Sequence, residues 1–162
     1  MEISKVIEHI REREYMSGVE RDKARVKETG EIFTQSWTAI ESLELLEKSD
    51  PTAFSDSTKT FIDPACGDGT LVGEVLIRKV ENGIDFNDAL GTIYGVDLMQ
   101  DNVELCRKRL LCGREDLQHI VEQNIVCADA LLYHYRFDGS PPYDPTPQEQ
   151  QQELFENLFE TE

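Results

Sequence analysis

Apolar residues recur at helical spacing among charged residues near the start of the chain, and this pattern predicts an amphipathic helix over residues 3–16. A charged connector is expected over residues 17–30. A second helix is expected to begin at Ser36, as its N-cap, and to end at Asp50-Pro51, because proline cannot continue a helix. The apolar faces of the two helices consist of Ile3, Val6, Ile7, Ile10 and Tyr15, and of Trp37, Ile40, Leu43 and Leu46.

From residue 59 onward, short apolar runs alternate with amphipathic segments. Strands are predicted over residues 59–62, 92–96 and 124–127, and helices over residues 71–80 and 102–111. This alternation predicts an α/β domain with a parallel sheet. Asp101 followed by Glu104 forms a capping-box pattern for the second of these helices. Gly113 and Asn82-Gly83 stand where helix-terminating residues are expected.

The composition is strongly acidic, since 33 acidic residues against 16 basic ones give a net charge of −17. This is the wrong sign for a protein that grips nucleic-acid phosphates by itself, so contact with DNA requires a local basic patch or a partner subunit. The main basic run, Arg107-Lys108-Arg109, diverges around a helix and is expected to form a solvated face.

The four cysteines show neither the spacing of a zinc site nor that of a disulfide framework, so reduced, mostly buried thiols are expected and no metal site is predicted. The start of the chain lacks a signal-peptide pattern, and no apolar run approaches the length of a membrane span, which predicts a cytoplasmic protein without membrane contact. The expected organisation is a helix with its connector over residues 1–28, one domain over 29–143 and an acidic, poorly ordered tail over 144–162.

The most informative segment runs from Phe61 to Thr70, where an apolar run ends on Asp63 and enters a glycine loop that opens a helix. Glycine lets the backbone approach a ligand closely, and a helix N-terminus offers unpaired N–H groups to an anionic group. A nucleotide-type cofactor is therefore expected. Val72 occupies the third glycine position of the dinucleotide pattern, which argues against NAD, and the absence of a Gly-Lys-Ser/Thr sequence excludes a P-loop.

An acidic residue follows each predicted strand: Asp63, Asp97 and Asp129. Ligands of an open parallel sheet bind beyond the carboxyl ends of its strands, so these side chains are expected to converge. A carboxylate after the second strand can accept hydrogen bonds from both ribose hydroxyls, and Asp129 can meet an adenine amino group between Leu98 and Leu131 as apolar walls. Taken singly, each acid is interpreted as a solvated loop residue or a helix cap.

Several segments together resemble a known family. Asp63-Pro64-Ala65-Cys66-Gly67-Asp68-Gly69-Thr70 resembles the cofactor motif of S-adenosylmethionine-dependent DNA methyltransferases that act on the N6 amine of adenine. Thr29-Gly30-Glu31-Ile32-Phe33-Thr34-Gln35 is similar to the segment that in this family contacts the methionine end of the cofactor, with Gln35 in place of the usual proline. Residues 93–97 and 124–131 are similar to the second- and third-strand motifs, so that the resemblance covers residues 29–132.

The resemblance implies a Rossmann-like class I methyltransferase fold, here with a partial parallel sheet and N-terminal helices, and S-adenosyl-L-methionine as cofactor. It also implies a site-specific, adenine-specific DNA methyltransferase of the restriction–modification type, or the cofactor-binding half of one. The cofactor-binding residues that it implies are Phe33, Thr34, Asp63, Ala65, Gly67, Gly69, Thr70, Asp97, Leu98, Asp129, Ala130 and Leu131.

The catalytic motif of the family is Asn, Asp or Ser followed by Pro-Pro and an aromatic residue, and Ser140-Pro141-Pro142-Tyr143 matches it. A side-chain oxygen and a prolyl carbonyl accept the hydrogens of the amine, while the ring stacks on a flipped base. In the family this motif follows an apolar strand, whereas residues 133–139 offer a short strand at best. A proline-rich loop at the start of the tail is the alternative interpretation.

Few residues follow Tyr143, so the first strand is expected to be an exposed sheet edge that a second copy or a second polypeptide covers. Residues 151–155 resemble peptides that bind sliding clamps, although a generic amphipathic tail explains them as well. The alternative functions are a non-catalytic S-adenosylmethionine-binding subunit, an acidic DNA mimic of the anti-restriction kind, and a methyltransferase with a protein or small-molecule acceptor.

Overall fold

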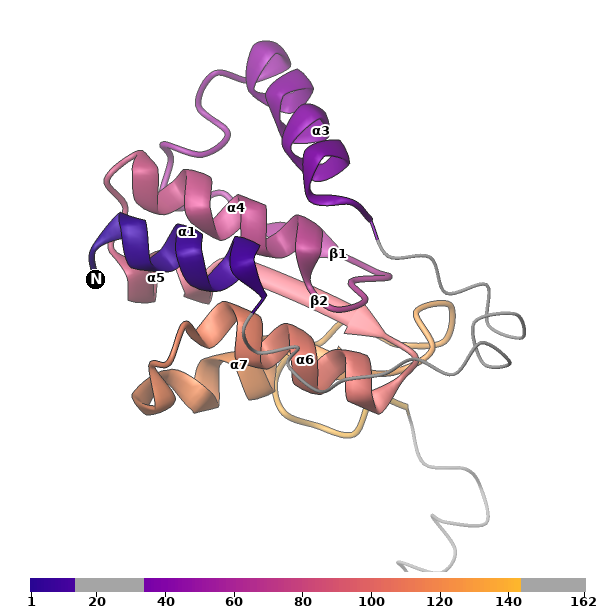
Figure 1. Ribbon diagram of the computed structural model, residues 1–162. Helices are drawn as coiled ribbons and strands as arrows, with labels where there is room; N and C mark the ends of the chain where they lie inside the picture. The colour runs from indigo at the N-terminus through magenta and orange to yellow at the C-terminus, as the bar shows by residue number, and fades with distance from the viewer. Residues whose placement is uncertain (14–33, 144–162) are drawn as a thin grey trace, which may run out of the picture.

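The computed structural model describes residues 1–13 and 34–143, and it has a mixed α/β architecture around a small parallel sheet (Figure 1). The three strands lie in the order β1-β2-β3, and both neighbouring pairs are parallel. The parallel sheet predicted from the sequence is thus confirmed. In chain order the elements are α1 (Ile3–Glu12), α3 (Ser36–Ser49), β1 (Phe61–Asp63), α4 (Thr70–Glu81), α5 (Phe86–Gly91), β2 (Ile93–Asp97), α6 (Gln100–Leu111), the 3-10 helix η2 (Glu115–Leu117), α7 (Gln118–Asn124) and β3 (Ile125–Cys127).

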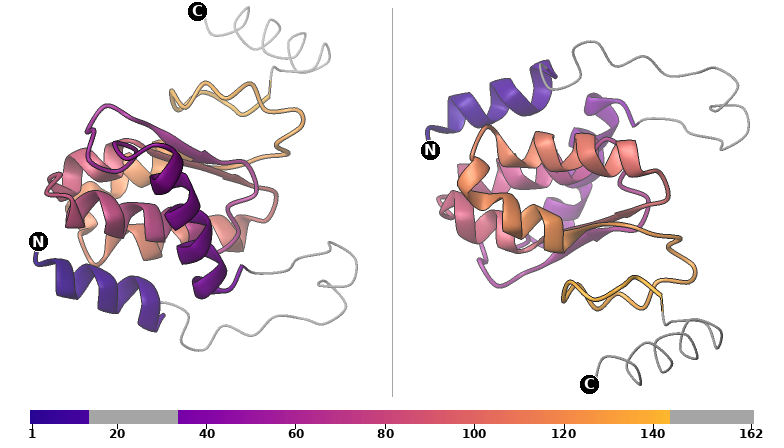
Figure 2. Two further views of the ribbon diagram at one scale, coloured as in Figure 1. Left: turned by 90° about the horizontal axis from the view of Figure 1, so that it is seen from above. Right: turned by 90° about the horizontal axis from the view of Figure 1, so that it is seen from below.

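The two faces of the sheet are covered differently. Phe61 pairs with Ile93, and these side chains pack in the main hydrophobic core together with the helices. Val96 pairs with Val126 on the opposite face, in a second, smaller cluster with Tyr133. Figure 2 shows α4, α6 and α7 on one side of the sheet and the segment 128–143 on the other.

Helix α4 lies at the centre of the helical layer. Eight of its residues are buried, because α1, α3, α5 and α6 all pack against it. Helix α1 contributes Val6 and Ile10 to this core, and its Arg11 forms an ion pair with the buried Glu74 of α4 at 2.8 Å. In the part of the chain described here, no helix is long and apolar enough to cross a membrane.

Several local expectations about the helices were wrong. Helix α6 begins at Gln100 after the N-cap Met99, so Asp101 lies inside the helix and the predicted capping box does not form. Gln35, and not Ser36, is the N-cap of α3. Trp37 is 67% exposed and does not pack on the core. Helices α5 and α7 span only 6 and 7 residues, too few for the sequence to display a helical period.

Strand β1 is an edge strand of the sheet, as predicted. On the helical side its Phe61 stacks on Phe54, with ring centroids 5.3 Å apart. On the opposite side Ile62 is 50% exposed, so the described residues cover this side of the strand only partly. That a second chain completes the sheet here stays a prediction.

Candidate functional site

The glycine loop between β1 and α4 folds back onto β2. Cys66 N–H donates to the carbonyl of Val96 at 2.9 Å, and the loop reaches α4 at its N-cap Gly69. Gly67 and Gly69 have φ angles of 52° and 82°, in the left-handed region that favours glycine. At Gly69 a Cβ atom would lie 2.7 Å from Sγ of Cys106, so α6 forms a close wall behind the loop.

Asp97, at the end of β2, is tied directly to this loop. Its Oδ2 accepts a hydrogen bond from Gly67 N–H at 3.0 Å, while Oδ1 accepts from Met99 N–H at 2.9 Å and from Asn102 Nδ2 at 3.1 Å. The structure therefore brings the acid after the second strand to the loop after the first. A carboxylate offers about four acceptor positions, so about one remains for a ligand hydroxyl without disturbing these bonds.

Asp63 lies at the base of the same loop, where its Oδ1 accepts from Ala65 N–H at 3.0 Å. Burial raises the pKa of Asp63 above its usual value, and the neighbouring carboxylate of Asp97 acts in the same direction, while the Ala65 hydrogen bond opposes both. A cationic group bound beside Asp63 would relieve this cost of burial.

A small hollow opens at the loop, with a volume of about 40 Å³. Thr34 lines this hollow beside the loop, although it lies about thirty residues earlier in the chain. Pockets that enclose a cofactor-sized ligand usually measure about 300–1,000 Å³, so the hollow accommodates only a fragment of such a ligand. Its lining residues are Thr34, Asp63, Ala65, Cys66, Gly67, Asp68, Thr70 and Leu71.

The other predicted cofactor residues that the structure describes do not line this hollow. Asp129 closes a turn in which its Oδ1 accepts from Leu131 N–H at 2.9 Å, with Ala130 between them. The two predicted apolar walls, Leu98 and Leu131, are 64% and 93% exposed. Phe33 lies outside the described residues, as do residues 151–155, which resemble clamp-binding peptides, and the rest of the acidic tail.

The Ser140–Tyr143 segment lies near the end of β3. The Tyr143 hydroxyl accepts a hydrogen bond from Asp129 N–H, so the structure joins this segment to the third acid. Ser140 donates its hydroxyl to Asp138 at 2.5 Å, and the Pro141 carbonyl accepts from Arg136 at 3.2 Å. Among the described residues no hydrogen bond links this segment to the loop of residues 63–70.

The residues before this segment form a folded loop and no strand. Tyr133, Tyr135 and Phe137 pack on one another, and Phe137 contacts Tyr94 of β2 with ring centroids 4.8 Å apart. Tyr135 and Phe137 have φ angles of 53° and 47°, which are unusual for such bulky residues. The short strand considered for this segment is therefore absent, because its aromatic side chains fold onto the open face of the sheet.

Sequence reasoning missed the role of Arg109. This side chain is 1% exposed, and its Nη1 donates to Asp68 Oδ1 at 3.1 Å and to the Thr70 hydroxyl at 2.7 Å. The interpretation of residues 107–109 as a solvated face is therefore wrong for Arg109, although Lys108 is exposed. A usable signal existed, since position 109 follows Cys106 by three residues and precedes Leu110 on the buried side of the helix.

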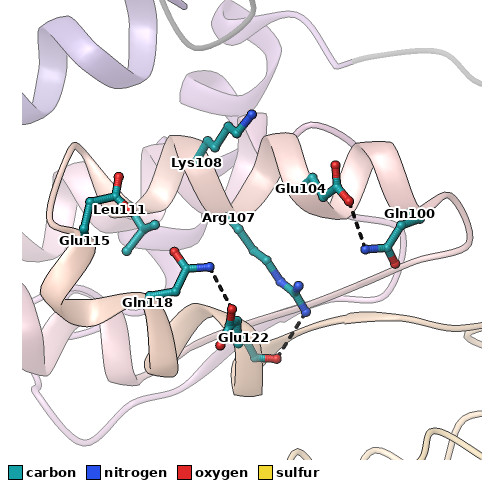
Figure 3. Close-up of a pocket in the computed structure, with 8 residues that line it drawn as sticks. All are labelled: Gln100, Glu104, Arg107, Lys108, Leu111, Glu115, Gln118 and Glu122. Carbon is teal, nitrogen blue, oxygen red and sulfur yellow. Dashed lines mark hydrogen bonds between the residues drawn. The ribbon is translucent and has the colours of Figure 1, made fainter.

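A larger hollow of about 470 Å³ lies away from the strand ends, between α6 and α7 (Figure 3). Arg107 crosses it and donates to the carbonyl of Glu122 at 3.2 Å, and Gln118 donates to the Glu122 side chain at 2.9 Å. Gln100 also donates to Glu104 at 3.3 Å, so several of its polar groups bind one another, and the groove carries charges of both signs. The smaller hollow, and not the larger one, lies at the carboxyl end of β1, where Asp63, the glycine loop and Thr70 at the start of α4 line it. The larger hollow is lined by Gln100, Glu104, Arg107, Lys108, Leu111, Glu115, Gln118 and Glu122.

Comparison of the chain with models of protein families, with curated proteins and with solved structures found no match. The fold and the side-chain geometry are therefore the observations on which a functional proposal rests. Within the described residues there is also no group of His, Cys, Asp and Glu side chains suited to holding a metal ion.

Proposed function

We propose that this chain binds S-adenosylmethionine at the carboxyl ends of β1 and β2, in a Rossmann-like class I methyltransferase fold. The observation that carries the proposal is the hydrogen bond from Gly67 N–H to the Asp97 carboxylate at 3.0 Å. It joins the glycine loop to the acid that follows the second strand, and Thr34 lines the hollow beside them. These three elements are far apart in the sequence and correspond to three segments of the methyltransferase resemblance.

The chemistry of the residues fits the two ends of this cofactor. At the methionine end, the N-terminus of α4 suits the carboxylate, and the half-buried Asp63 suits the ammonium group. At the nucleoside end, Asp97 suits a ribose hydroxyl, and Leu98 and Leu131 offer exposed apolar surface to the adenine ring beside Asp129. In this proposal the methionine end occupies the small hollow, and the nucleoside end lies over the exposed carboxyl ends of the strands.

The proposed reaction is methylation of the N6 amine of adenine in DNA, for which the cofactor supplies an electrophilic methyl group on its sulfonium. Ser140 and the carbonyl of Pro141 accept the hydrogens of the amine in this proposal, and the ring of Tyr143 stacks on the base. The sequence motif supports this step. Catalysis requires the segment to release the Pro141 carbonyl from Arg136 and the Tyr143 hydroxyl from Asp129.

The Pro141 carbonyl and the Tyr143 hydroxyl are already hydrogen-bonded within the chain, which favours a second candidate. This candidate is a cofactor-binding subunit that depends on another chain for catalysis. The acidic charge of −17 points the same way, because DNA phosphates repel such a surface unless a partner supplies basic residues. The free edge of β1 is the place where we expect that partner to bind.

Calorimetric titration with S-adenosylmethionine tests the binding step. We expect the wild-type chain to bind and Asp97→Asn to bind at least about tenfold more weakly, since an amide cannot accept from all the donors that meet this carboxylate. Asp116→Asn is the matched control, because it removes an equal charge from the exposed η2 segment. Absence of binding by the folded wild-type chain refutes the proposal.

Methyl transfer from labelled cofactor to adenine-containing duplex DNA separates the two candidates. Turnover by the wild-type chain that Tyr143→Ala and Ser140→Ala both abolish supports the enzyme. Cofactor binding without turnover supports the dependent subunit. Turnover that both substitutions leave unchanged removes this segment from the catalytic site.

A further inference from the structure

Arg109 is a fully buried charged side chain behind the loop, and it forms hydrogen bonds with two loop residues. Its Nη1 donates to Asp68 Oδ1 at 3.1 Å and to the Thr70 hydroxyl at 2.7 Å. The Thr70 hydroxyl in turn donates to the same Asp68 oxygen at 2.8 Å. Arg109 and Asp68 are each 1% exposed, so these bonds form away from solvent.

Backbone hydrogen bonds hold both ends of the loop, from Cys66 N–H to Val96 and from Gly69 N–H to Cys66, while the side chain of Asp68 adds a contact in its middle. Gly67 and Gly69 flank Asp68, and glycine is the residue whose backbone is least restricted. Asp68 is the one loop residue between them, and its buried carboxylate points to α6. Arg109 therefore holds the middle of a segment that would otherwise have several accessible conformations.

Helix α6 contacts the loop at two positions on one face. Cys106 forms the close wall behind Gly69, and Arg109, one turn further along, binds Asp68 and Thr70. Arg13, at the end of α1, adds a longer contact, with its Nη1 3.8 Å from Asp68 Oδ2. The same loop also donates from Gly67 N–H to Asp97, which lies three residues before the start of α6 at Gln100. The position of α6 thus sets both the shape of the loop and its distance from Asp97.

We infer that Arg109 is a positioning residue of the cofactor site: its guanidinium, bound to Asp68 and Thr70, holds the loop between β1 and α4 in the conformation that receives the ligand. The inference rests on the proposed function. A buried ion pair contributes little net stability compared with apolar residues of similar volume, so its main effect is to select one conformation. Arg109 does not contact the ligand in this scheme, and it acts through Asp68 and the N-terminus of α4.

Hydrogen exchange of the ligand-free protein tests the positioning directly. We expect Arg109→Met to speed exchange of the amides of residues 67–71 at least about tenfold beyond the change in the slowest core amides, because the loop opens locally. Asp68→Asn is expected to have a smaller effect in the same direction. Glu74→Gln is the matched control. Glu74 lies on α4 outside the loop, and its carboxylate is as buried as that of Asp68 and pairs with Arg11 of α1.

Titration with S-adenosylmethionine gives the second readout. Arg109→Met is expected to bind at least about tenfold more weakly, with Arg109→Lys intermediate, since lysine restores the charge but not the planar fork. The Glu74→Gln variant is expected to bind like wild type. If Arg109→Met does not fold, Arg109→Lys and Asp68→Asn provide the comparison.

Two results overturn the inference. One is loop exchange in the Arg109 and Asp68 variants that changes no more than in Glu74→Gln. The other is wild-type cofactor affinity in a variant whose loop exchange has increased. Failure of the proposed function is distinguishable from both, because it appears as absence of binding by the wild-type chain while the exchange comparison remains measurable.

Discussion

Gly69 provides the sharpest test of the loop geometry. Replacement by alanine has two separable effects, because the residue has a φ of 82° and because its Cβ would lie 2.7 Å from Cys106 Sγ. The left-handed backbone costs about 1–2 kcal/mol for a residue with a side chain. Overlap in a well-packed interior costs about 1–3 kcal/mol more. Gly69→Ala is therefore expected to lower the free energy of unfolding by about 2–5 kcal/mol.

Gly83 is a matched control within the same chain. Its φ of 86° is nearly equal, but no atom lies within 4 Å of a Cβ built on it. Gly83→Ala is thus expected to show the backbone effect alone, about 1–2 kcal/mol. Adding Cys106→Ala to Gly69→Ala removes the shortest contact, so the double variant is expected to be more stable than the sum of the single effects predicts.

Urea denaturation followed by far-ultraviolet circular dichroism measures these differences. The slope of the free energy against denaturant should stay constant if each variant unfolds between the same two states. Equal destabilisation by Gly69→Ala and Gly83→Ala would refute the close wall that α6 forms behind the loop. So would a double variant whose stability equals the sum of the single effects.

Three further predictions concern single side chains. Asp63 has a raised pKa, so the stability of the wild-type protein falls as the pH rises from the pKa of Asp63 in the unfolded state through its pKa in the folded state. The melting temperature of Asp63→Asn should therefore match that of wild type in acid and exceed it at neutral pH. Phe137→Ala should lower the free energy of unfolding by about 1–3 kcal/mol, because it removes the contact with Tyr94. Leu131→Ala, at a 93% exposed residue, should change the free energy of unfolding by less than about 0.5 kcal/mol. Equal effects of the two substitutions in urea denaturation would contradict the packing of this loop. Trp37→Ala should likewise stay within about 0.5 kcal/mol, and a large loss would restore a packing role for this exposed ring.

Much of the sheet-forming region could be predicted from local pattern. The strands β1, β2 and β3 and the helices α4 and α6 were predicted within two residues at each end, because the strands are short apolar runs and the two helices are long enough to show an amphipathic pattern. The parallel arrangement followed from their alternation. The glycine loop could also be predicted, because glycine at a strand-to-helix turn indicates a backbone conformation that other residues adopt with difficulty. By contrast, α5 and α7 are too short to show a helical period. The position of an N-cap shifts by one or two residues with the tertiary packing of its helix.

The sequence by itself determined the order of the elements, the glycine loop and the acids that follow the strands, because these depend on neighbouring residues and on rules that hold for any parallel sheet. The tertiary structure alone decided which charges are buried and which motifs meet. Arg109 lies in a basic run that looks solvated, and it became an internal ion pair when α6 packed behind the loop. Tyr143 reached Asp129 because the aromatic loop folded onto the open face of the sheet. Such contacts join distant residues, and their energies depend on how the layers pack and not on any local pattern.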